Sequence, residues 1–193
     1  MKDMNGEPTG VYVKRMNDVL LSDRKLFEHF EFCTVREDEA EEVSEVEAAC
    51  FPPGEACTPE RMKERISAAK DIFLVVKDKA AGSIIGFVNG IATNDTELKD
   101  QFYTDASLHD TDGKNVMICS VCVLPEYRKQ GIAREMICEY CRRESARNRK
   151  KLILTCKKEK VRMYEKFGFV DMGTSDSSWG GTSWNQMELI LNK

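Results

Sequence analysis

VCVLPEYRKQGIA, residues 121–133, contains the end of an apolar strand, a cationic turn and the start of a helix. The β-branched run from Val121 predicts the strand, and Pro125 ends it because proline lacks a backbone donor. An amphipathic helix then runs from Gly131 to about residue 146. The first turn of a helix has N–H groups without intrahelical partners and carries partial positive charge. The stretch therefore predicts a cradle for a polyanion such as a pyrophosphate.

Side chains in the turn support the same prediction. Arg128 and Lys129 add full positive charges, while Gly131 and Ala133 keep bulky groups away from the backbone. The alternative is a solvated basic turn that connects a strand to a helix and binds nothing. These residues alone leave both interpretations open.

The pattern Arg128-x-x-Gly131-x-Ala133 resembles the acyl-CoA-binding motif of the GNAT superfamily of N-acetyltransferases. A second motif of that superfamily lies downstream, at Tyr164-x-x-x-Gly-Phe. The resemblance implies that the turn binds the pyrophosphate of acetyl-CoA, which enters as a cosubstrate. It assigns three strand residues and six turn residues to the cofactor: Val121, Cys122, Val123, Arg128, Lys129, Gln130, Gly131, Ile132 and Ala133.

The resemblance covers residues 31–193 and implies an N-acetyltransferase domain, preceded by a partly helical extension, residues 1–30. The order of strand and helix patterns is that of an α/β protein. The resemblance implies a mixed, mostly antiparallel central sheet of six to seven strands flanked by helices. Two neighbouring parallel strands, 116–124 and 152–155, are expected to splay apart and hold acyl-CoA, whose pantetheine pairs with backbone groups as another strand would.

Hydrophobic periodicity predicts the individual elements. Strands are expected at 31–36, 72–76, 83–92, 116–124, 152–155, 169–173 and 182–191, and helices at 37–49, 59–69, 131–146 and 158–167. Apolar residues between positions 11 and 30 fit one or two helices on the outside of the domain. Residues 94–115 are polar, acidic and long for a loop, so they are either functional or mobile.

Two further segments resemble the arylalkylamine N-acetyltransferase group within that superfamily. One is Glu47-x-x-x-Phe51, and the other is a hairpin over residues 179–187 that contains Trp184. This likeness implies direct acetyl transfer to a primary amine of a small molecule. Phe51 and Trp184 would then sandwich an aryl group, and Met117 would face the substrate.

The reaction needs an acid and a base. The resemblance assigns the acid to Tyr164, which would protonate the departing thiolate. Vertebrate-type relatives carry two histidines, as candidate bases, at positions occupied here by Met117 and Cys119, and both histidines of this chain lie outside the motifs. Deprotonation of the amine is therefore expected through a water chain or through Glu47, with Cys119 ranked third.

Eight cysteines raise the question of a metal site. Cys119-x-x-Cys122 and Cys138-x-x-Cys141 have the spacing of a four-cysteine zinc site. Strand positions three apart point to opposite faces, however, so Cys119 and Cys122 are not expected to reach one metal. No metal is expected, the cysteines are expected to be free thiols, and a zinc-binding interaction protein is the remaining alternative.

Composition narrows the class of protein. The chain has 193 residues, 41% of them hydrophobic, and a formal net charge of -4, which argues against general nucleic-acid binding. It lacks an apolar run of the about 18 residues that cross a membrane, and it lacks the apolar core of a signal peptide. A soluble cytoplasmic protein with no membrane or nucleic-acid partner is expected. Its expected partner is a small-molecule amine, and a homodimer is left open.

Two other functions fit the same residues. One keeps the enzyme and changes the acceptor to a polyamine, an amino acid, an antibiotic or a protein amine. The other is a binding module that senses acyl-CoA without turnover, an alternative that the missing histidines make worth testing.

Overall fold

Seven strands form one sheet, in the order β1-β2-β3-β4-β5-β7-β6, in the computed structural model, which describes residues 25–191. The strands are β1 (Phe30–Thr34), β2 (Leu74–Asp78), β3 (Ile84–Thr93), β4 (Asn115–Val123), β5 (Lys151–Cys156), β6 (Val170–Thr174) and β7 (Asn185–Ile190). Neighbouring strands run antiparallel except β4 and β5, which run parallel. The expected mixed, mostly antiparallel sheet is therefore confirmed.

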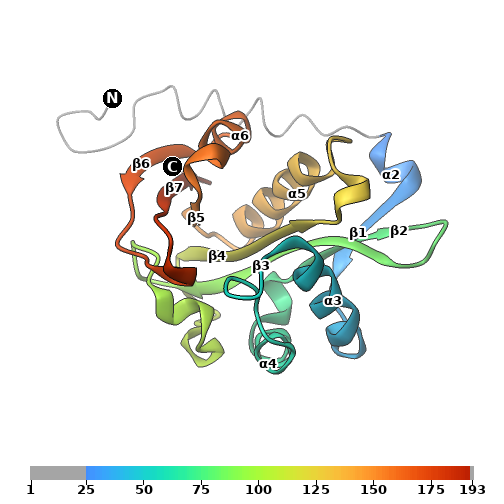
Figure 1. Cartoon of the computed structure of the whole chain (residues 1–193), viewed down its shortest axis with the longest axis horizontal. Helices are drawn as coiled ribbons and strands as arrows, with labels where there is room; N and C mark the ends of the chain where they lie inside the picture. The colour runs from blue at the N-terminus through green and yellow to red at the C-terminus, as the bar shows by residue number, and fades with distance from the viewer. Residues whose placement is uncertain (1–24, 192–193) are drawn as a thin grey trace.

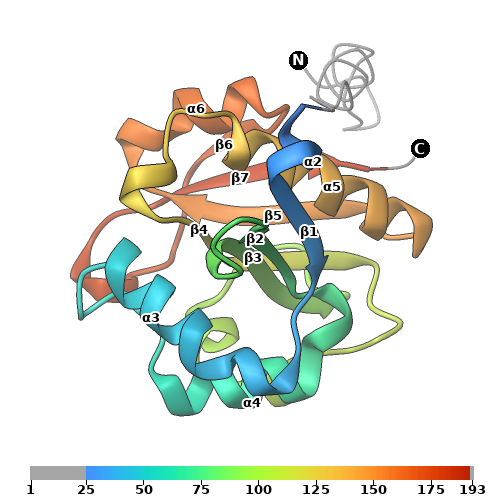
Figure 2. The same cartoon turned by 90° about the vertical axis from the view of Figure 1, so that its right-hand side faces the viewer.

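Helices cover both faces of the sheet (Figure 1). They are α2 (Leu26–His29), α3 (Ala40–Cys50), α4 (Pro59–Ala69), α5 (Ile132–Ala146) and α6 (Val161–Lys166). Helices α3 and α4 lie on the face drawn below the sheet in Figure 1, and α5 lies above it. Figure 2 shows the same layers from the side, with α5 and α6 opposite α3 and α4. The sheet is thus enclosed between two helical layers.

Local sequence signals explain how the lower helices form. In α4 the Thr58 hydroxyl accepts the Arg61 N–H at 3.4 Å, and Pro59 occupies the first helical position, where no N–H partner is needed. In α3 the buried residues Val43 and Val46 recur at helical spacing. Both helices therefore turn an apolar stripe toward the sheet.

Two sets of apolar side chains hold the layers together. Helix α5 contributes Met136, Ile137 and Tyr140 to a cluster with residues of β3, β4, β5 and β7. On the other face, α3 and α4 pack Val43 and Ile66 against β2 and β3. Each fully buried side chain of this size contributes ~1.5–3 kcal/mol, so the two clusters fix the sheet between its helices.

The parallel pair separates along its length. Strands β4 and β5 pair only through residues 115–118 and 151–154. Beyond that point β4 continues along β3 alone. The β3 partners of Ser120 and Ile118 are consecutive residues, so Cys119 between them is a β-bulge. The separation confirms that these two parallel strands splay apart.

The acidic segment 94–115 is a packed part of the domain. It contains two 3-10 turns, Asp100–Tyr103 and Ala106–Leu108. Leu98 and Phe102 are buried in a cluster with Met117 of β4. Apolar residues spaced through a polar segment therefore hold it against the sheet.

Several element ends differ from the expectation. The helices expected from residues 37 and 158 each begin with a 3-10 turn, Glu37–Glu39 before α3 and Lys158–Lys160 before α6. The last strand, expected from residue 182, begins at Asn185, so Trp184 precedes β7. A turn with positive φ at Gly180 and Gly181 delays that strand.

The structure tests only part of the expectation for the N-terminal region. Residues 1–24 lie outside the described residues. Helix α2 follows them, and β1 already begins at Phe30, inside the expected extension. Among residues 25–191, no helix has both the length and the apolar character needed to cross a membrane.

Candidate active site

A cavity of about 730 Å³ opens where β4 and β5 part. Its walls come from β4, β5, the β4–α5 turn, α6, the α3–α4 loop and the segments around residues 103 and 179–184. The expected site residues that line it are Glu47, Phe51, Cys119, Val121, Val123, Arg128, Lys129, Gly131, Ile132, Ala133, Tyr164 and Trp184. Met117, Cys122 and Gln130 do not line it. The fold therefore gathers motifs from distant parts of the chain around one space.

The β4–α5 turn forms one wall of the cavity. Lys129 and Gly131 have positive φ angles of 64° and 87°, and Gly131 is the N-cap residue of α5. Glycine adopts this left-handed conformation without a Cβ penalty. Left-handed residues next to a helix N-terminus turn successive N–H groups toward one point, which suits a phosphate. The turn therefore has the local geometry of an anion cradle.

Val123 identifies the edge of β4 that faces the cavity. Its carbonyl accepts Arg128 Nε at 2.9 Å and the Cys50 thiol at 3.4 Å, instead of a group of β5. The N–H and C=O of one strand residue point to the same side, and those of the next residue point to the other. Val121 and Val123 therefore direct their backbone groups to the cavity, and Cys122 directs its own to β3.

Tyr164 of α6 lines the cavity. Its ring packs edge-on against Phe167 and Phe169, with centroids 6.0 and 5.6 Å away. Its hydroxyl has no hydrogen-bond partner within residues 25–191, whereas the other described tyrosine hydroxyls each have one. Burial raises the pKa of Tyr164 above its ordinary value. The hydroxyl is therefore protonated at neutral pH and free to donate.

Glu47 of α3 also lines the cavity and is 2% exposed. Its Oε1 accepts the Cys57 N–H and the Ser120 hydroxyl, both at 3.1 Å, and its Oε2 accepts the Cys122 thiol at 3.1 Å. Burial raises the pKa of Glu47, and these hydrogen bonds only partly oppose the rise. A carboxylate has about four acceptor sites, so one remains on Glu47 for a proton.

The two positions where histidines were expected have different surroundings. Met117 is fully buried beside Ile91 and Phe102, away from the cavity. Cys119 lines the cavity, and burial raises the pKa of its thiol to about 11. Cys119 is therefore protonated at neutral pH, which leaves Glu47 better suited to accept a proton.

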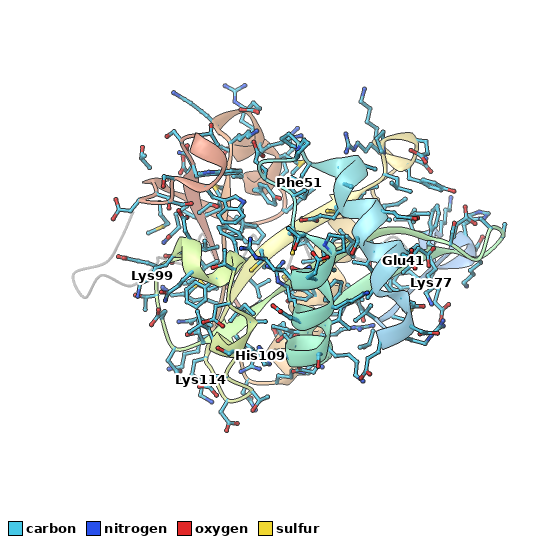
Figure 3. All side chains as sticks on the ribbon, turned by 60° about the horizontal axis from the view of Figure 1, so that its bottom comes forward. Glu41, Phe51, Lys77, Lys99, His109 and Lys114 are labelled. Carbon is cyan, nitrogen blue, oxygen red and sulfur yellow. The ribbon has the colours of Figure 1, made fainter. Side chains whose placement is uncertain are left out.

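Both histidines lie away from the cavity lining. His29 is exposed at the end of α2. The side chain of His109 is buried, with Nδ1 accepting the Ala92 N–H at 3.1 Å and Nε2 lying 3.4 Å from the Asp71 carboxylate. In Figure 3, which views the side of α3 and α4, His109 lies beside one end of α4 and Phe51 lies toward the other. His109 thus fastens the acidic segment to β3.

Aromatic side chains form another part of the lining. Phe51 follows α3 and Trp184 precedes β7. Tyr103 and Trp179, which were not expected at the site, stack with ring centroids 5.0 Å apart. Trp184 Nε1 donates to the Trp179 carbonyl at 2.9 Å, and Trp179 Nε1 donates to the Glu55 carbonyl at 3.1 Å. This wall suits an apolar or aromatic group.

Charged side chains interrupt the aromatic wall. Lys157 pairs with Glu55 at 2.6 Å, and its Nζ lies 5.8 Å from the ring centre of Trp184. Arg65 of α4 is 3% exposed and lines the cavity. Sequence reasoning missed Arg65, although its helical spacing from the buried Met62 was an available signal.

Cys50 has the one acidified thiol among the described cysteines. Hydrogen bonding with Cys122 and the cation of Arg128 lower the pKa of Cys50 to about 7. The pKa of every other described cysteine is raised by burial. Cys50 lines the cavity, so a partly ionised sulfur lies beside the β4–α5 turn.

The two cysteine pairs with zinc-like spacing lie on different faces of the sheet. The Cys119 thiol donates to the carbonyl of Phe102, whose neighbour Tyr103 bonds to Arg65 of α4. The Cys122 thiol donates to Glu47 of α3, so the bulge places both thiols on the side of α3 and α4. This corrects the expectation that they point to opposite faces. Cys138 and Cys141 lie in α5, above the sheet. Within residues 25–191, no group of three or more potential ligands is arranged to hold a metal.

Comparison with known proteins agrees with this geometry. A family model described as an acetyltransferase (GNAT) domain matches residues 39–191. No curated protein matches this sequence. The fold is similar to the GphF GNAT-like decarboxylase in complex with isobutyryl-CoA, with 13% identity, a TM-score of 0.70 and coverage of 84% of this chain and 100% of the other.

Two further solved structures have the same fold. The loading GNATL domain of CurA from Lyngbya majuscula has 14% identity and a TM-score of 0.69, with coverage of 84% of this chain and 98% of that domain. A GNAT superfamily phosphinothricin acetyltransferase from Sinorhizobium meliloti, in complex with AcCoA, has 15% identity and a TM-score of 0.62, with coverage of 85% of this chain and 89% of that protein.

Proposed function

This chain belongs to the acetyltransferase (GNAT) domain family, and on that premise we propose that it transfers an acetyl group from acetyl-CoA to a primary amine of a small molecule. The observation that carries the proposal is the hydroxyl of Tyr164. It has no partner among the described residues, and it lies on the same cavity as the anion cradle. A proton donor without a structural partner, beside a cofactor cleft, fits an acid that serves a reaction.

In this proposal acetyl-CoA lies with its pyrophosphate on the β4–α5 turn and its pantetheine along β4. The pyrophosphate contact is supported by the left-handed backbone at Lys129 and Gly131 and by the positive charge of Arg128. The cavity-facing backbone groups of Val121 and the N–H of Val123 support the pantetheine contact, because they can pair with amides as a neighbouring strand would.

The proposed reaction is a direct transfer. The amine nitrogen attacks the carbonyl carbon of the thioester, a C–N bond forms and the C–S bond breaks. Glu47, directly or through a water molecule, takes the proton that the nitrogen loses, and Tyr164 gives its proton to the departing thiolate. An alkyl amine has a pKa near ~10.4, so only about one molecule in a thousand is neutral at pH 7 without such help.

The finer proposal concerns the acceptor, which we take to carry an aromatic or apolar group, as an arylalkylamine does. Phe51 and Trp184, the two residues of the arylalkylamine likeness, line the cavity together with Tyr103 and Trp179. Aromatic walls bind aromatic groups through burial and edge or offset contacts. Lys157 is paired with Glu55, so it does not repel an incoming ammonium as a lone cation would.

An amine panel tests the proposal. Purified protein is mixed with acetyl-CoA and with arylalkylamines, polyamines, amino acids, aminoglycosides or a peptide, and the released CoA thiol is measured. The expected result is saturable release with a small primary amine, and mass spectrometry then identifies the N-acetylated product. The matched control is the N,N-dimethyl form of the best acceptor, which cannot form a stable amide.

Calorimetry with acetyl-CoA separates catalysis from binding. Acetyl-CoA binding without thiol release for every amine would contradict the proposed reaction and favour a non-catalytic acyl-CoA-binding module. Failure to bind acetyl-CoA at all would contradict the proposed cradle as well.

A further inference from the structure

Arg65 is a buried cation on the wall of the cavity. It belongs to α4, and the residue is 3% exposed. It lies on the same buried stripe as Met62, Ile66 and Ala69, where a helix facing a sheet ordinarily carries apolar residues. An arginine is costly to bury at such a position unless an anion compensates its charge.

The described contacts of Arg65 are with neutral groups. Its Nη1 donates to Asn89 Oδ1 at 3.3 Å, and its Nη2 donates to the Tyr103 carbonyl at 2.9 Å. Among the carboxylates of residues 25–191, none forms an ion pair with it. The cation is attracted by Glu47, but the Glu47 oxygens are engaged by Cys57, Ser120 and Cys122.

A second buried arginine provides the comparison. Arg149 is 2% exposed, and its Nε lies 3.5 Å from Glu144. That is the usual arrangement, because a guanidinium removed from water is costly unless a carboxylate and hydrogen bonds compensate it. Arg149 lies away from the cavity lining, whereas Arg65 is part of it. The missing carboxylate at Arg65 can therefore be supplied by a molecule in the cavity.

We propose that Arg65 binds a carboxylate of the acceptor, so that the amine acetylated by this protein is an amino acid or a related amino-carboxylate. This inference rests on the proposed N-acetyltransferase function and narrows its substrate class. The planar guanidinium presents several N–H groups in a fork that matches the two oxygens of a carboxylate. The amine of the same molecule is then held on the wall that contains Glu47.

The charge on this wall favours a carboxylate over a phosphate. Lys157, which also lines the cavity, is paired with Glu55, and Arg65 has used two of its N–H groups on Asn89 and Tyr103. One positive charge without an ion pair among the described residues matches one carboxylate. The doubly charged phosphate of an alternative ligand would remain half unpaired in a buried site.

Matched acceptor pairs test the inference in the full chain with acetyl-CoA. Each pair compares an amino acid with its decarboxylated amine: tryptophan with tryptamine, phenylalanine with phenethylamine, and arginine with agmatine. For the best pair, we expect kcat/KM to be higher for the amino acid by about ten-fold or more, the size of one hydrogen bond to a charged group. The Arg65→Met variant should lose this preference, mainly through KM for the amino acid.

Two further variants separate recognition from structure. Arg65→Lys keeps the charge without the fork and should restore part of the preference. Lys63→Met removes a charge from the exposed side of the same helix and should leave the preference intact. The KM for acetyl-CoA should be the same in all of these proteins, because the cradle lies in the β4–α5 turn.

Product inhibition of the unaltered protein gives a readout that does not depend on the folding of a variant. N-acetyltryptophan should inhibit at about ten-fold lower concentration than N-acetyltryptamine. Equal inhibition, or equal use of the two members of every pair, would overturn the inference and leave the proposed acetyl transfer standing. Equal loss on both members in a folded Arg65→Met variant would also overturn it, because Arg65 would then only position Tyr103. Absence of thiol release with every amine would overturn the proposed function and this inference with it.

Discussion

At the scale of single residues, hydroxyl partners distinguish the described tyrosines. The Tyr140 hydroxyl donates to the Ile72 carbonyl at 2.8 Å, and the Tyr127 hydroxyl donates to Asp78 at 3.0 Å. Tyr164 has no such bond among the described residues, although it belongs to the same buried cluster as Tyr140. A buried hydroxyl normally finds a partner, so its hydrogen-bonding capacity is available to a ligand.

Replacement of Tyr164 by phenylalanine tests this role. Tyr164→Phe should lower kcat by about ten-fold or more, because a positioned acid contributes roughly 10²–10⁴-fold to a proton-transfer step. The affinity for acetyl-CoA, measured by calorimetry, should change little, since the ring is kept. Tyr140→Phe is the control: it should lower the melting temperature and leave kcat unchanged. An unchanged kcat in Tyr164→Phe would remove this residue from the mechanism.

Glu47 predicts a pH dependence with a definite sign. Burial raises its pKa above the ordinary 4.5, so the carboxyl becomes protonated as pH falls through this raised value and can no longer accept a proton. The kcat/KM should therefore fall on the acid side of a profile taken from about pH 5 to 9. Glu47→Gln should have lower activity and lack this acid limb. Glu42→Gln, on the same helix outside the cavity lining, should keep it; the same limb in both variants would exclude Glu47 as the base.

Cys50 predicts a site-selective chemical modification. Its pKa of about 7 makes roughly half of the thiol a thiolate at neutral pH, and the thiolate is the reactive form. Iodoacetamide should modify Cys50 first, with a rate that rises through pH 7, and acetyl-CoA should protect it because it lines the cavity. Peptide mass spectrometry identifies the site. Cys57, which also lines the cavity but has a raised pKa, should react later; the reverse order would contradict the assigned acidity.

At the scale of elements, Gly131, the N-cap residue of α5, has a left-handed backbone conformation and also belongs to the proposed cofactor cradle. Gly131→Ala should cost roughly 1–2 kcal/mol of stability, because a Cβ is unfavourable at positive φ. It should also raise the Kd for acetyl-CoA, since the cradle depends on this conformation. Gly82→Ala is the matched control, with φ of 72° in the β2–β3 connection and open space around an added Cβ.

The two glycine variants are compared by thermal unfolding and by calorimetry. Both should lose stability to a similar extent, and only Gly131→Ala should bind acetyl-CoA more weakly. Equal affinities for acetyl-CoA in the two variants would show that the N-terminus of α5 does not contribute to cofactor binding.

Much of this element-level arrangement was predictable, because it depends on local signals. Thr58 followed by Pro59 predicted the start of α4, and Pro125 and Gly131 predicted the end of β4 and the start of α5. The bulge at Cys119 was not predictable, since it arises from the register between β3 and β4. The expectation about the faces of Cys119 and Cys122 failed for that reason.

Residues of the candidate site that belong to a sequence motif could be named in advance. Residues that reach the cavity only through tertiary packing could not. The cradle, Tyr164, Glu47 and Trp184 came from short patterns in the sequence. Tyr103 comes from the acidic segment, and only the folded chain brings it to Trp179. Arg65 looked like one charged residue among many on a helix, because burial depends on which helical face meets the sheet.

At the scale of the whole molecule, the cavity lies between two parts of the sheet that share only a short parallel pairing. A ligand that bridges β4 and β5 should therefore stabilise the folded state. At about 100 times its Kd, acetyl-CoA should add ~2.7 kcal/mol, which corresponds to a rise of roughly 5 to 10 °C in melting temperature for a chain of this size. Scanning calorimetry measures this shift, and no shift at saturation would contradict binding to the native fold.

The contact between Arg128 and Val123 has a consequence for solubility. A strand edge with unpaired backbone groups is a template on which other chains add strands and aggregate. In this protein the Arg128 guanidinium covers the Val123 carbonyl at 2.9 Å on the open edge of β4. The side chain keeps a bulky charge where β4 leaves β5. A charged side chain in this position opposes the pairing of another chain with this edge of β4, so replacement of Arg128 by alanine is expected to make the protein more prone to aggregate.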